Sequence, residues 1–419
     1  MSFIYNIALC LASAATVAGR HLGKGKSKFG LFSRGQKHLI ATIQQELGKN
    51  DGEVCWIHVA SLGEYNVVKP LMHELRKKYV IVLTFFSSTG IEALHGLSYR
   101  YTEADHIFYL PLDTRHNANK FLDIVRPSRA VFGISEYWPN YLKELGKRHI
   151  PTFIVSQLVG EKSSLMQWYG KWLYRAALKS VTTFMVLNEE SKQNLESLGF
   201  KNVIVTGDSL FDNASAIAAT AYQNSIVEHF CKSGGGKVFI AGSISDKKDL
   251  KLIATLANKH KDVKFIFVPH EISREGIYQI LYEVEGKVQL YSDSSDTDDF
   301  KDVQVLVIDF LGALARLYRY GTWVYVGGGF TPFLHSLVEP VAYGLPVSFG
   351  PCIGRKTTPS ELIRLGIGEK VSAFKDLDKW FINLKDNDAL LHSISESAKM
   401  YVSQNAGSTR QVVSIIERG

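Results

Sequence analysis

Short apolar runs alternate with amphipathic segments along most of the chain. In the first half these runs are nearly continuous in Val, Ile and Phe, as in strands that are buried on both faces of a parallel sheet. They predict strands over residues 54–61, 80–86, 107–112, 129–135, 152–157, 183–188 and 203–207. The segments between them, such as VVKPLMHELRKKY and EESKQNLESLG, have helical periodicity. This alternation predicts an α/β fold that is built on a parallel sheet.

A second series of strands follows the GGGK segment at residues 234–237. It predicts strands over residues 238–243, 263–269, 288–292, 303–309, 322–328 and 345–350. A chain of 419 residues is too long for one ordinary core, and the small and polar residues of 209–237 mark a boundary. We therefore expect two Rossmann-like domains with parallel sheets that face each other across a cleft. The expected divisions are an N-terminal anchor and basic flank (1–30), an N-terminal domain (31–210), a C-terminal domain (211–390) and a helical segment that packs back on the N-terminal domain (391–419).

The first residues form an uncharged, mostly apolar segment, FIYNIALCLASAATVA at 3–18, which is followed by several Lys and Arg residues. A signal peptide carries its positive charge before the apolar stretch, whereas a membrane span needs about 20 apolar residues. An interfacial anchor fits the length and the basic flank, and an ordinary buried helix remains an alternative. We expect the segment to contact the membrane surface, with the rest of the chain on the cytoplasmic side.

Composition narrows the classes of partner. The net charge of +7 suits an anionic membrane or an anionic substrate. The chain has no long Lys/Arg run and no zinc-finger spacing, so a nucleic-acid partner is not expected. Its four cysteines are far apart in sequence and form no CxxC pair, which is typical of a reducing compartment and indicates no metal site.

The loops that follow the predicted strands carry the candidate chemistry, because parallel sheets bind ligands beyond the carboxyl ends of their strands. The loop AGSISDK (241–247) precedes a helix, where backbone N–H groups can bind a phosphate or where Ser and Asp can simply cap the helix. The segment VGGGF (326–330) lacks the GxGxxG spacing of a dinucleotide site. The sequence also lacks P-loop, HExxH and GxSxG motifs.

Two carboxylates stand at the predicted start of a helix. Glu64 follows the strand at 54–61, and Glu339 lies in HSLVEPVAYGLPVSFGP (335–351). Either can stabilise the helix N-terminus. Glu339 can alternatively accept two hydrogen bonds from ribose hydroxyls, and Glu64 can alternatively take a proton at the mouth of a cleft.

Taken in order, the motifs resemble those of the Kdo transferases, the 3-deoxy-D-manno-octulosonic acid transferases of lipopolysaccharide synthesis. The resemblance rests on WIHVASLGEYNVVKPL (56–71), VLTFFSSTG (82–90), YLPLD (109–113), SEYWPN (135–140), VTGDSLFD (205–212), VGGGF, HSLVEPVAYGLPVSFGP and QNAGSTRQVV (404–413). It implies a glycosyltransferase of the GT-B fold that moves Kdo from CMP-Kdo to the lipid A precursor. It further implies inversion of configuration, no cofactor and no catalytic metal, and a place at the cytoplasmic face of the bacterial inner membrane.

The resemblance also assigns roles to residues. Glu64 would be the general base that deprotonates the acceptor hydroxyl. The N-terminal domain would bind the acceptor through Ser61, Gly63, Lys69, Thr89 and Glu136. The C-terminal domain would bind the donor through Gly242, Ser243, Pro269, His270, Gly328, Gly329, His335 and Glu339.

The chain departs from the family pattern in several places, which leaves individual contacts open. The family often has Glu-Thr-Glu before Trp-Pro-Asn, whereas this chain has Ile134-Ser135-Glu136 and lacks the first Glu. The family commonly has Asn-Ala-Arg after the next strand, whereas this chain has Ser156-Gln157-Leu158 and lacks the Arg. His335-Ser336 and His270-Glu271 also differ from the usual pairs. The alternatives are a GT-B enzyme that uses a UDP-sugar on a lipid-linked acceptor, and a non-catalytic two-domain binding protein.

Overall fold

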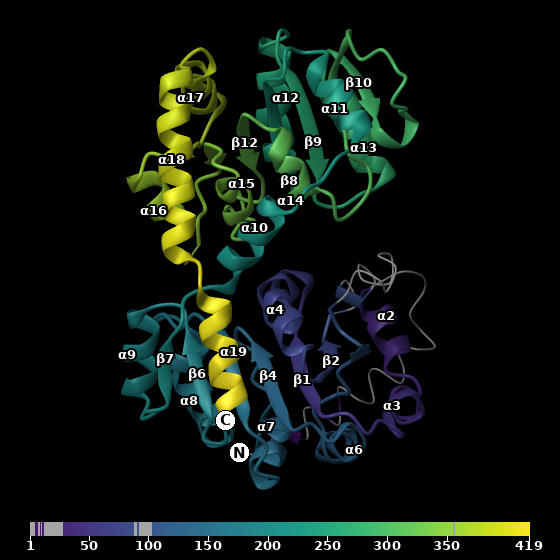
Figure 1. Cartoon of the computed structure of the whole chain (residues 1–419), viewed down its shortest axis with the longest axis vertical. Coiled ribbons are helices and arrows are strands. Elements are labelled where there is room, and N and C mark those ends of the chain that lie inside the picture. Colours follow the sequence, from purple (N-terminus) through teal and green to yellow (C-terminus); the bar gives the residue numbers. More distant parts are fainter. Residues whose placement is uncertain are drawn as a thin grey trace. The chain divides into compact units, whose positions relative to one another are not determined.

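The chain folds into two α/β units, which Figure 1 shows as a ribbon. The computed structural model describes residues 5, 6, 9, 11, 28–87, 90, 91, 103–354 and 357–419. Unit 1 consists of residues 1–213 and 406–419, and unit 2 consists of residues 214–405. Most of the apolar segment 3–18 and Thr89 lie outside the described residues. Among the helices of the described residues, none is both long and apolar enough to cross a membrane.

Unit 1 is built on a parallel sheet of seven described strands in the order β3-β2-β1-β4-β5-β6-β7. The strands are β1 (Val54–Val59), β2 (Val80–Phe85), β3 (His106–Tyr109), β4 (Arg129–Gly133), β5 (Thr152–Gln157), β6 (Thr183–Val186) and β7 (Val203–Val205). The chain runs outward from β1 to β3 and then returns to β4, on the other side of β1. The order therefore reverses between β1 and β4, which is the switch point where open α/β sheets bind ligands.

Helices cover both faces of this sheet. The described helices are α2 (Lys28–Gly35), α3 (Leu39–Leu47), α4 (Leu62–Leu75), α6 (Arg115–Val125), α7 (Pro139–Lys147), α8 (Trp168–Leu178), α9 (Glu189–Ser197) and α19 (Ser408–Arg418). On β1, Trp56 enters a core with α3, α6, α7, α8 and α9, whereas Cys55 and Ile57 enter a second core with α4 and α19. Burial on both faces explains why the sequence of β1 is apolar apart from His58.

The N-terminus of α7 is capped by a buried side chain from a distant loop. Asp113 accepts hydrogen bonds from the backbone amides of Asn140 and Tyr141 at 3.0 and 2.9 Å. It also accepts one from the hydroxyl of Tyr5 at 2.8 Å. The motifs YLPLD and SEYWPN thus meet in space, because the first supplies the acceptor for the helix that the second begins.

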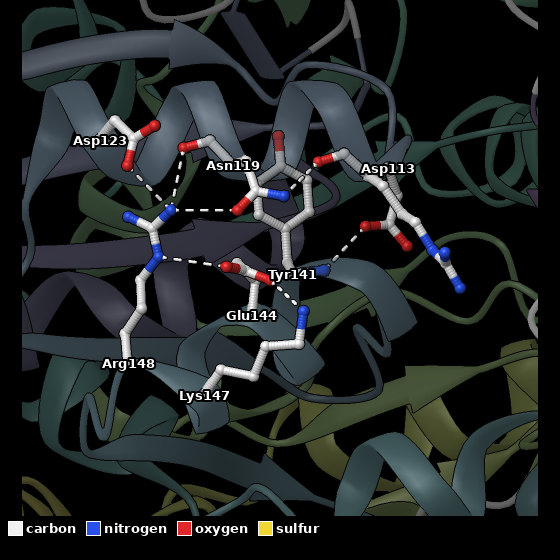
Figure 2. Close-up of polar contacts among 8 residues, drawn as sticks. Asp113, Asn119, Asp123, Tyr141, Glu144, Lys147 and Arg148 are labelled. Atoms are coloured by element: carbon white, nitrogen blue, oxygen red, sulfur yellow. Dashed lines mark hydrogen bonds and ion pairs between the residues drawn. The ribbon is translucent and has the colours of Figure 1, made fainter.

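The other end of α7 is tied to α6 by polar contacts (Figure 2). Arg148 contacts two residues of α6: its guanidinium lies 2.9 Å from the carboxylate of Asp123 and donates a hydrogen bond to the side-chain oxygen of Asn119 at 3.2 Å. It also contacts Glu144 on its own helix at 3.5 Å. Capping at one end and pairing at the other fix the helix that follows the loop after β4.

Replacing Asp113 by Asn is expected to lower the free energy of unfolding of the chain by about 1 kcal/mol, because one of its two acceptor oxygens becomes a donor. Denaturant unfolding, followed by circular dichroism, measures this change. Asp123→Asn is the matched control, since it weakens an exposed ion pair of α6, and we expect it to change stability by less than about 0.5 kcal/mol. Equal effects of the two substitutions would contradict the capping role.

Unit 2 repeats the same plan with a second parallel sheet of seven described strands, in the order β10-β11-β9-β8-β12-β13-β14. The strands are β8 (Val238–Ile244), β9 (Lys264–Pro269), β10 (Lys287–Leu290), β11 (Val303–Val307), β12 (Trp323–Val326), β13 (Val347–Phe349) and β14 (Gly368–Lys370). The order reverses between β8 and β12, so the switch point lies at the ends of these two strands.

The helices of unit 2 are α11 (Ser225–Lys232), α12 (Lys247–Lys259), α13 (Arg274–Glu283), α14 (Leu314–Leu317), α15 (Val338–Ala342), α16 (Thr358–Arg364), α17 (Phe374–Lys385) and α18 (Asp388–Asn405). In the core, Phe381 of α17 packs edge-on against Trp323 of β12 and Phe239 of β8. The two Rossmann-like units confirm the predicted fold class. The short strand β14 and the helix α8 are absent from the predicted elements.

The chain returns from unit 2 to unit 1 near its last helices. The expected segment 391–419 is divided, because α18 belongs to unit 2 and only residues 406–419 belong to unit 1. In unit 1, α19 buries Val412 and Ile416 in the core that also contains α4. Arg129 of β4 donates to the backbone oxygen of Ile416 at 2.7 Å, which ties α19 to the central strands.

The expected boundary region 209–237 is largely helical. α10 (Ser209–Ala219) crosses the division between residues 213 and 214, and α11 follows it. On the unit 1 side, Asp212 accepts hydrogen bonds from the backbone amides of Gly407 and Thr409, at 2.7 and 2.8 Å. Asp212 therefore holds together the two segments by which the chain leaves and re-enters unit 1.

Candidate functional site

The switch point of unit 1 brings together the loops that follow β1 and β4. The loop after β1 leads into Glu64, and the loop after β4 carries Glu136. Ile134, between β4 and Glu136, has a φ of 54°. A β-branched residue rarely adopts this left-handed conformation, which costs about 1–3 kcal/mol and is found mostly at functional sites. The strained turn aims Glu136 toward the end of β1.

Glu64 occupies the first turn of α4 and takes part in its cap. Ser61, the residue before the helix, accepts a hydrogen bond from the amide of Glu64 at 3.4 Å. The Glu64 carboxylate in turn accepts one from the amide of Ala60 at 2.7 Å. This reciprocal arrangement resembles a capping box, so the helix-stabilising role considered for Glu64 is present in the structure.

Burial gives the Glu64 carboxyl a second property. Loss of solvent raises its pKa to about 7, and the nearby charge of Glu136 adds to the rise, although the hydrogen bond from Ala60 opposes it. A helix N-terminus favours the ionised form of a carboxyl, but at Glu64 burial outweighs that effect. A pKa near the operating pH suits a general base, which takes up a proton and releases it again.

Glu136 belongs to a chain of polar groups that reaches into the core. The indole N–H of Trp138 donates to the Glu136 carboxylate at 2.9 Å and lies 2.9 Å from Nε2 of His58. His58 is fully buried on β1, and its Nδ1 lies 2.9 Å from the hydroxyl of Thr84 on β2. The Thr84 hydroxyl also accepts a hydrogen bond from the buried indole of Trp56 at 2.8 Å. The orientation of Glu136 is thus set by side chains from β1, β2 and the loop after β4.

An aromatic surface borders the two carboxylates. Phe86, directly after β2, is 36 % exposed, and its ring lies 4.9 Å from that of Trp138. The ring centroid of Phe86 also lies 5.1 Å from that of Phe32. Apolar rings with a few fixed polar groups are the usual lining of a small-molecule site.

The other residues predicted for the acceptor differ in their placement. Gly63 is exposed, and a Cβ added there would meet only the Ser61 hydroxyl, at 3.7 Å. Packing therefore does not require a glycine at this position. Lys69 follows Glu64 by five positions on α4, which is about 140° around the helix, so α4 does not bring the two together on one face.

The switch point of unit 2 is formed by closely packed backbone. Ser243, near the end of β8, has a φ of 54°. A Cβ added to Gly327 would lie 2.1 Å from the carbonyl oxygen of Ser243. A Cβ on Gly329 would lie 2.5 Å from the amide nitrogen of Gly350, and Gly328 has a φ of 85°. The glycines after β12 are therefore needed for close approach and for a left-handed turn. Gly242 is similarly confined, because its Cβ would lie 2.4 Å from the hydroxyl of Tyr318.

A buried carboxylate joins the two loops at this switch point. Asp249 of α12 accepts hydrogen bonds from the amides of Gly328 and Ser245, at 2.8 and 3.1 Å, and from the hydroxyl of Tyr325 at 2.6 Å. Its burial raises the pKa of the carboxyl, a rise that these three hydrogen bonds oppose. Asp246 caps α12 by accepting the amide hydrogens of Lys248 and Asp249. Capping of α12 is therefore present in the structure, and phosphate binding by AGSISDK stays a prediction.

Two histidines of unit 2 follow β9 and β12, the strands on either side of β8. The rings of His270, after β9, and His335, after the glycine loop, lie 4.3 Å apart. His335 Nε2 lies 2.7 Å from the hydroxyl of Ser245, which itself donates to the carbonyl of Ser243 at 2.8 Å. Either atom of the Ser245–His335 pair can be the donor, depending on the tautomer of His335.

Two further predicted donor residues lie nearby. Pro269 is half-buried at the end of β9, next to His270. Glu339 lies in the five-residue helix α15. The pKa of Tyr318 is raised mainly by the burial of Tyr318 itself, and the charge of Glu339 adds to the rise. The hydroxyl of Tyr318 also lies next to Gly242. Five of the predicted donor residues thus lie at the carboxyl ends of the central strands β8, β9 and β12, namely Ser243, His270, Gly328, Gly329 and His335. Their roles as ligand-binding residues stay predictions.

Sequence reasoning missed three residues that organise these sites, namely His58, Trp138 and Asp249. The one available signal for His58 was a polar residue within an otherwise apolar strand. Trp138 is part of SEYWPN, where its indole N–H could have been considered as a donor. Asp249 is indistinguishable from an ordinary polar residue in the first turn of a helix.

Within the described part of the chain, no group of three or more His, Cys, Asp or Glu side chains is placed to hold a metal ion. The metal-free mechanism that the resemblance implies stays a prediction.

Comparisons with known proteins add to this geometry. The model of a family described as 3-deoxy-D-manno-octulosonic-acid transferase (kdotransferase) matches residues 26–213. A 3-deoxy-D-manno-octulosonic acid transferase of Chlamydia trachomatis is 23% identical over 411 residues, which cover 95% of this chain and 90% of that protein. A bifunctional glycosyltransferase/methyltransferase of Fusobacterium nucleatum is 25% identical over 84% of this chain, and the match spans only 56% of that longer protein.

A solved structure shares the fold. The UDP-GlcNAc 2-epimerase from Neisseria meningitidis, bound to UDP-GlcNAc, superposes with a TM-score of 0.62 over 88% of this chain and 100% of that one. The sequence identity is 15%, so the likeness concerns the fold alone.

Proposed function

We propose that this chain, which belongs to the family of 3-deoxy-D-manno-octulosonic acid (Kdo) transferases, transfers Kdo from CMP-Kdo to the lipid A precursor with inversion of configuration. Membership of this family makes the chain a Kdo glycosyltransferase of lipopolysaccharide synthesis. The donor, the acceptor and the inverting mechanism are the proposed part. The observation that carries the proposal is the half-buried Glu64 carboxyl at the switch point of unit 1, with a pKa of about 7.

In the proposed reaction, an acceptor hydroxyl binds beside the Glu64 carboxylate. Glu64 takes the proton as the oxygen bonds to the anomeric carbon of Kdo, and the bond from that carbon to the CMP phosphate oxygen breaks. The electron pair leaves with CMP, which departs as a phosphate monoester. The open space at Gly63 and the aromatic surface of Phe86 and Trp138 support the approach of a sugar to this carboxylate.

The donor is proposed to bind unit 2 at the loops after β8 and β12. His270 and His335 can donate hydrogen bonds to the leaving phosphate, which lowers the cost of the charge that develops there. Glu339 is proposed to accept hydrogen bonds from the ribose hydroxyls. We further propose that residues 1–30 hold the enzyme at the cytoplasmic face of the inner membrane, where an amphiphilic acceptor is found.

The proposal is tested by incubating the purified chain with CMP-Kdo and lipid IVA, and by measuring CMP release and the product mass. We expect one equivalent of CMP for each Kdo that is added. Thermal shift with free nucleotides is the companion measurement, with CMP and not UDP expected to stabilise the chain. Stabilisation by UDP alone, together with no turnover of CMP-Kdo, would overturn the proposal in favour of a UDP-sugar enzyme.

The pH dependence of kcat/KM is expected to report Glu64. A base acts in its deprotonated form, so the rate should be constant well above pH 7 and should fall about tenfold per pH unit well below it. The measurement is a profile of kcat/KM across this range with constant ionic strength. A profile that stays flat down to the ordinary pKa range of a glutamate would contradict the role of the buried carboxyl.

A further inference from the structure

Helix α8 in unit 1 exposes an unusual set of aromatic side chains. Trp168 is 79 % exposed and Trp172 is 45 % exposed, and Tyr169 packs edge-on against Trp168 with ring centroids 5.9 Å apart. Large aromatic side chains are normally buried, since each removes a considerable apolar area from water. Their gathering on one helix indicates a surface that contacts another apolar medium.

Basic residues share the same face of α8. Residues 168, 171, 172, 175 and 179 are spaced by three or four positions, so Trp168, Lys171, Trp172, Arg175 and Lys179 form one stripe along the helix. All five side chains are exposed, and residues 168–179 include no acidic residue. The stripe therefore combines aromatic rings with positive charge alone.

The opposite face fixes the helix in the fold. Ala177 and Leu178 are buried in the core that contains β1 and β5. Gly170 lies against the preceding 3-10 turn (Ser164–Met166) so closely that an added Cβ would lie 1.9 Å from the carbonyl oxygen of Ser164. The stripe cannot turn inward without loss of this packing, so its exposure is a property of the folded unit.

We propose that this stripe docks on an anionic membrane surface. Trp and Tyr prefer the interface between headgroups and acyl chains, and Lys and Arg beside them attract anionic headgroups. A helix of 11 residues is too short to span a bilayer, but it can lie in the plane of the interface. This surface is separate from the apolar segment 3–18. It does not rest on the proposed reaction, since contact with lipid needs neither donor nor acceptor.

A second exposed aromatic patch serves as a comparison. On α13 in unit 2, Tyr278 and Tyr282 are 70 % and 87 % exposed, but the groove beside them is lined by Glu275 and Glu283 as well as by Lys247. Mixed charge gives this patch no net attraction to an anionic surface. The substitution pair Tyr278→Ala/Tyr282→Ala is therefore a matched control for exposed aromatic residues.

The test uses the full chain with vesicles of phosphatidylcholine and phosphatidylglycerol that contain brominated acyl chains, which quench tryptophan fluorescence on contact. We expect quenching in the wild type and in Tyr278→Ala/Tyr282→Ala. In Trp168→Phe/Trp172→Phe, the quenching should be lost although the melting temperature is unchanged. Lys171→Glu/Arg175→Glu should weaken binding to these vesicles by about tenfold or more, with little change for phosphatidylcholine alone.

Quenching is read separately from total binding, because residues 3–18 can hold the chain on vesicles by themselves. Equal quenching in the wild type and in Trp168→Phe/Trp172→Phe would overturn the proposal, since it would place α8 away from the lipid. Quenching by anionic vesicles that is as strong in Lys171→Glu/Arg175→Glu as in the wild type would also overturn it. Failure of the transfer assay with intact quenching would leave this surface standing and would count only against the proposed reaction.

Discussion

Replacing Glu64 by Gln is expected to lower kcat for Kdo transfer by about 10²–10⁴-fold, which is the usual contribution of a positioned general base. Gln keeps a side-chain oxygen that can accept the hydrogen bond from the amide of Ala60, so the start of α4 should be preserved. Its amide cannot take the proton of the acceptor hydroxyl. The measurement is the rate of CMP release at saturating donor and acceptor, with thermal unfolding recorded in parallel.

The control for this experiment lies on the same helix. Glu74 is half-buried at the far end of α4 and pairs with Lys77 at 2.6 Å, so Glu74→Gln removes a carboxylate from α4 without touching the site. We expect it to leave kcat unchanged. If Glu64→Gln turned over like Glu74→Gln, Glu64 would be a cap and the base would have to be sought elsewhere, with Glu136 as the nearest carboxylate.

Replacing Asp249 by Ala is expected to have the largest effect in unit 2. The substitution leaves the amides of Ser245 and Gly328 and the hydroxyl of Tyr325 without their acceptor, and the resulting cost is about 3 kcal/mol or more of unfolding free energy. The loops after β8 and β12 lose the side chain that joins them, so affinity for CMP should fall by at least about tenfold. Calorimetric titration with CMP and denaturant unfolding measure the two effects.

Two further variants separate the effects of stability and of loop geometry. Tyr325→Phe removes only the hydrogen bond to Oδ1 of Asp249 and leaves the two amide hydrogen bonds to Oδ2. It should therefore lower the free energy of unfolding by about 1 kcal/mol and keep CMP affinity. Asp246→Ala removes the cap of α12, with a similar cost to stability. If Asp249→Ala bound CMP like Tyr325→Phe, the nucleotide would not depend on the geometry of the joined loops.

The sequence was most informative where the pattern is local. Continuous apolar runs predicted β1 and β8, and the loops after the predicted strands were selected as candidate ligand sites. The switch points among them could not be selected, because they depend on the order of the strands in each sheet. Glu64 could be selected because it directly follows β1. Its raised pKa could not be predicted, since the burial responsible for it comes from side chains that the fold brings together.

Contacts between distant residues account for the rest. His58 and Trp138 are 80 positions apart, and Asp249 and Gly328 are 79 apart, so no spacing rule connects them. Helix α8 was missed for another reason. Its outer face is aromatic and basic where an ordinary surface helix is polar, so the apolar periodicity that reveals amphipathic helices is obscured.

The discontinuous composition of unit 1 affects the order in which the chain can fold during synthesis. All of unit 2, from residue 214 to 405, is translated before residues 406–419 can add α19 to the core that holds α4. Unit 2 can complete its own core as soon as it emerges, because domains generally fold as units during synthesis. Unit 1 must wait with one face of its sheet incompletely covered. The helix that carries Glu64 therefore reaches its final packing late, and a chain that ends at residue 405 has all of unit 2 but lacks α19 of unit 1.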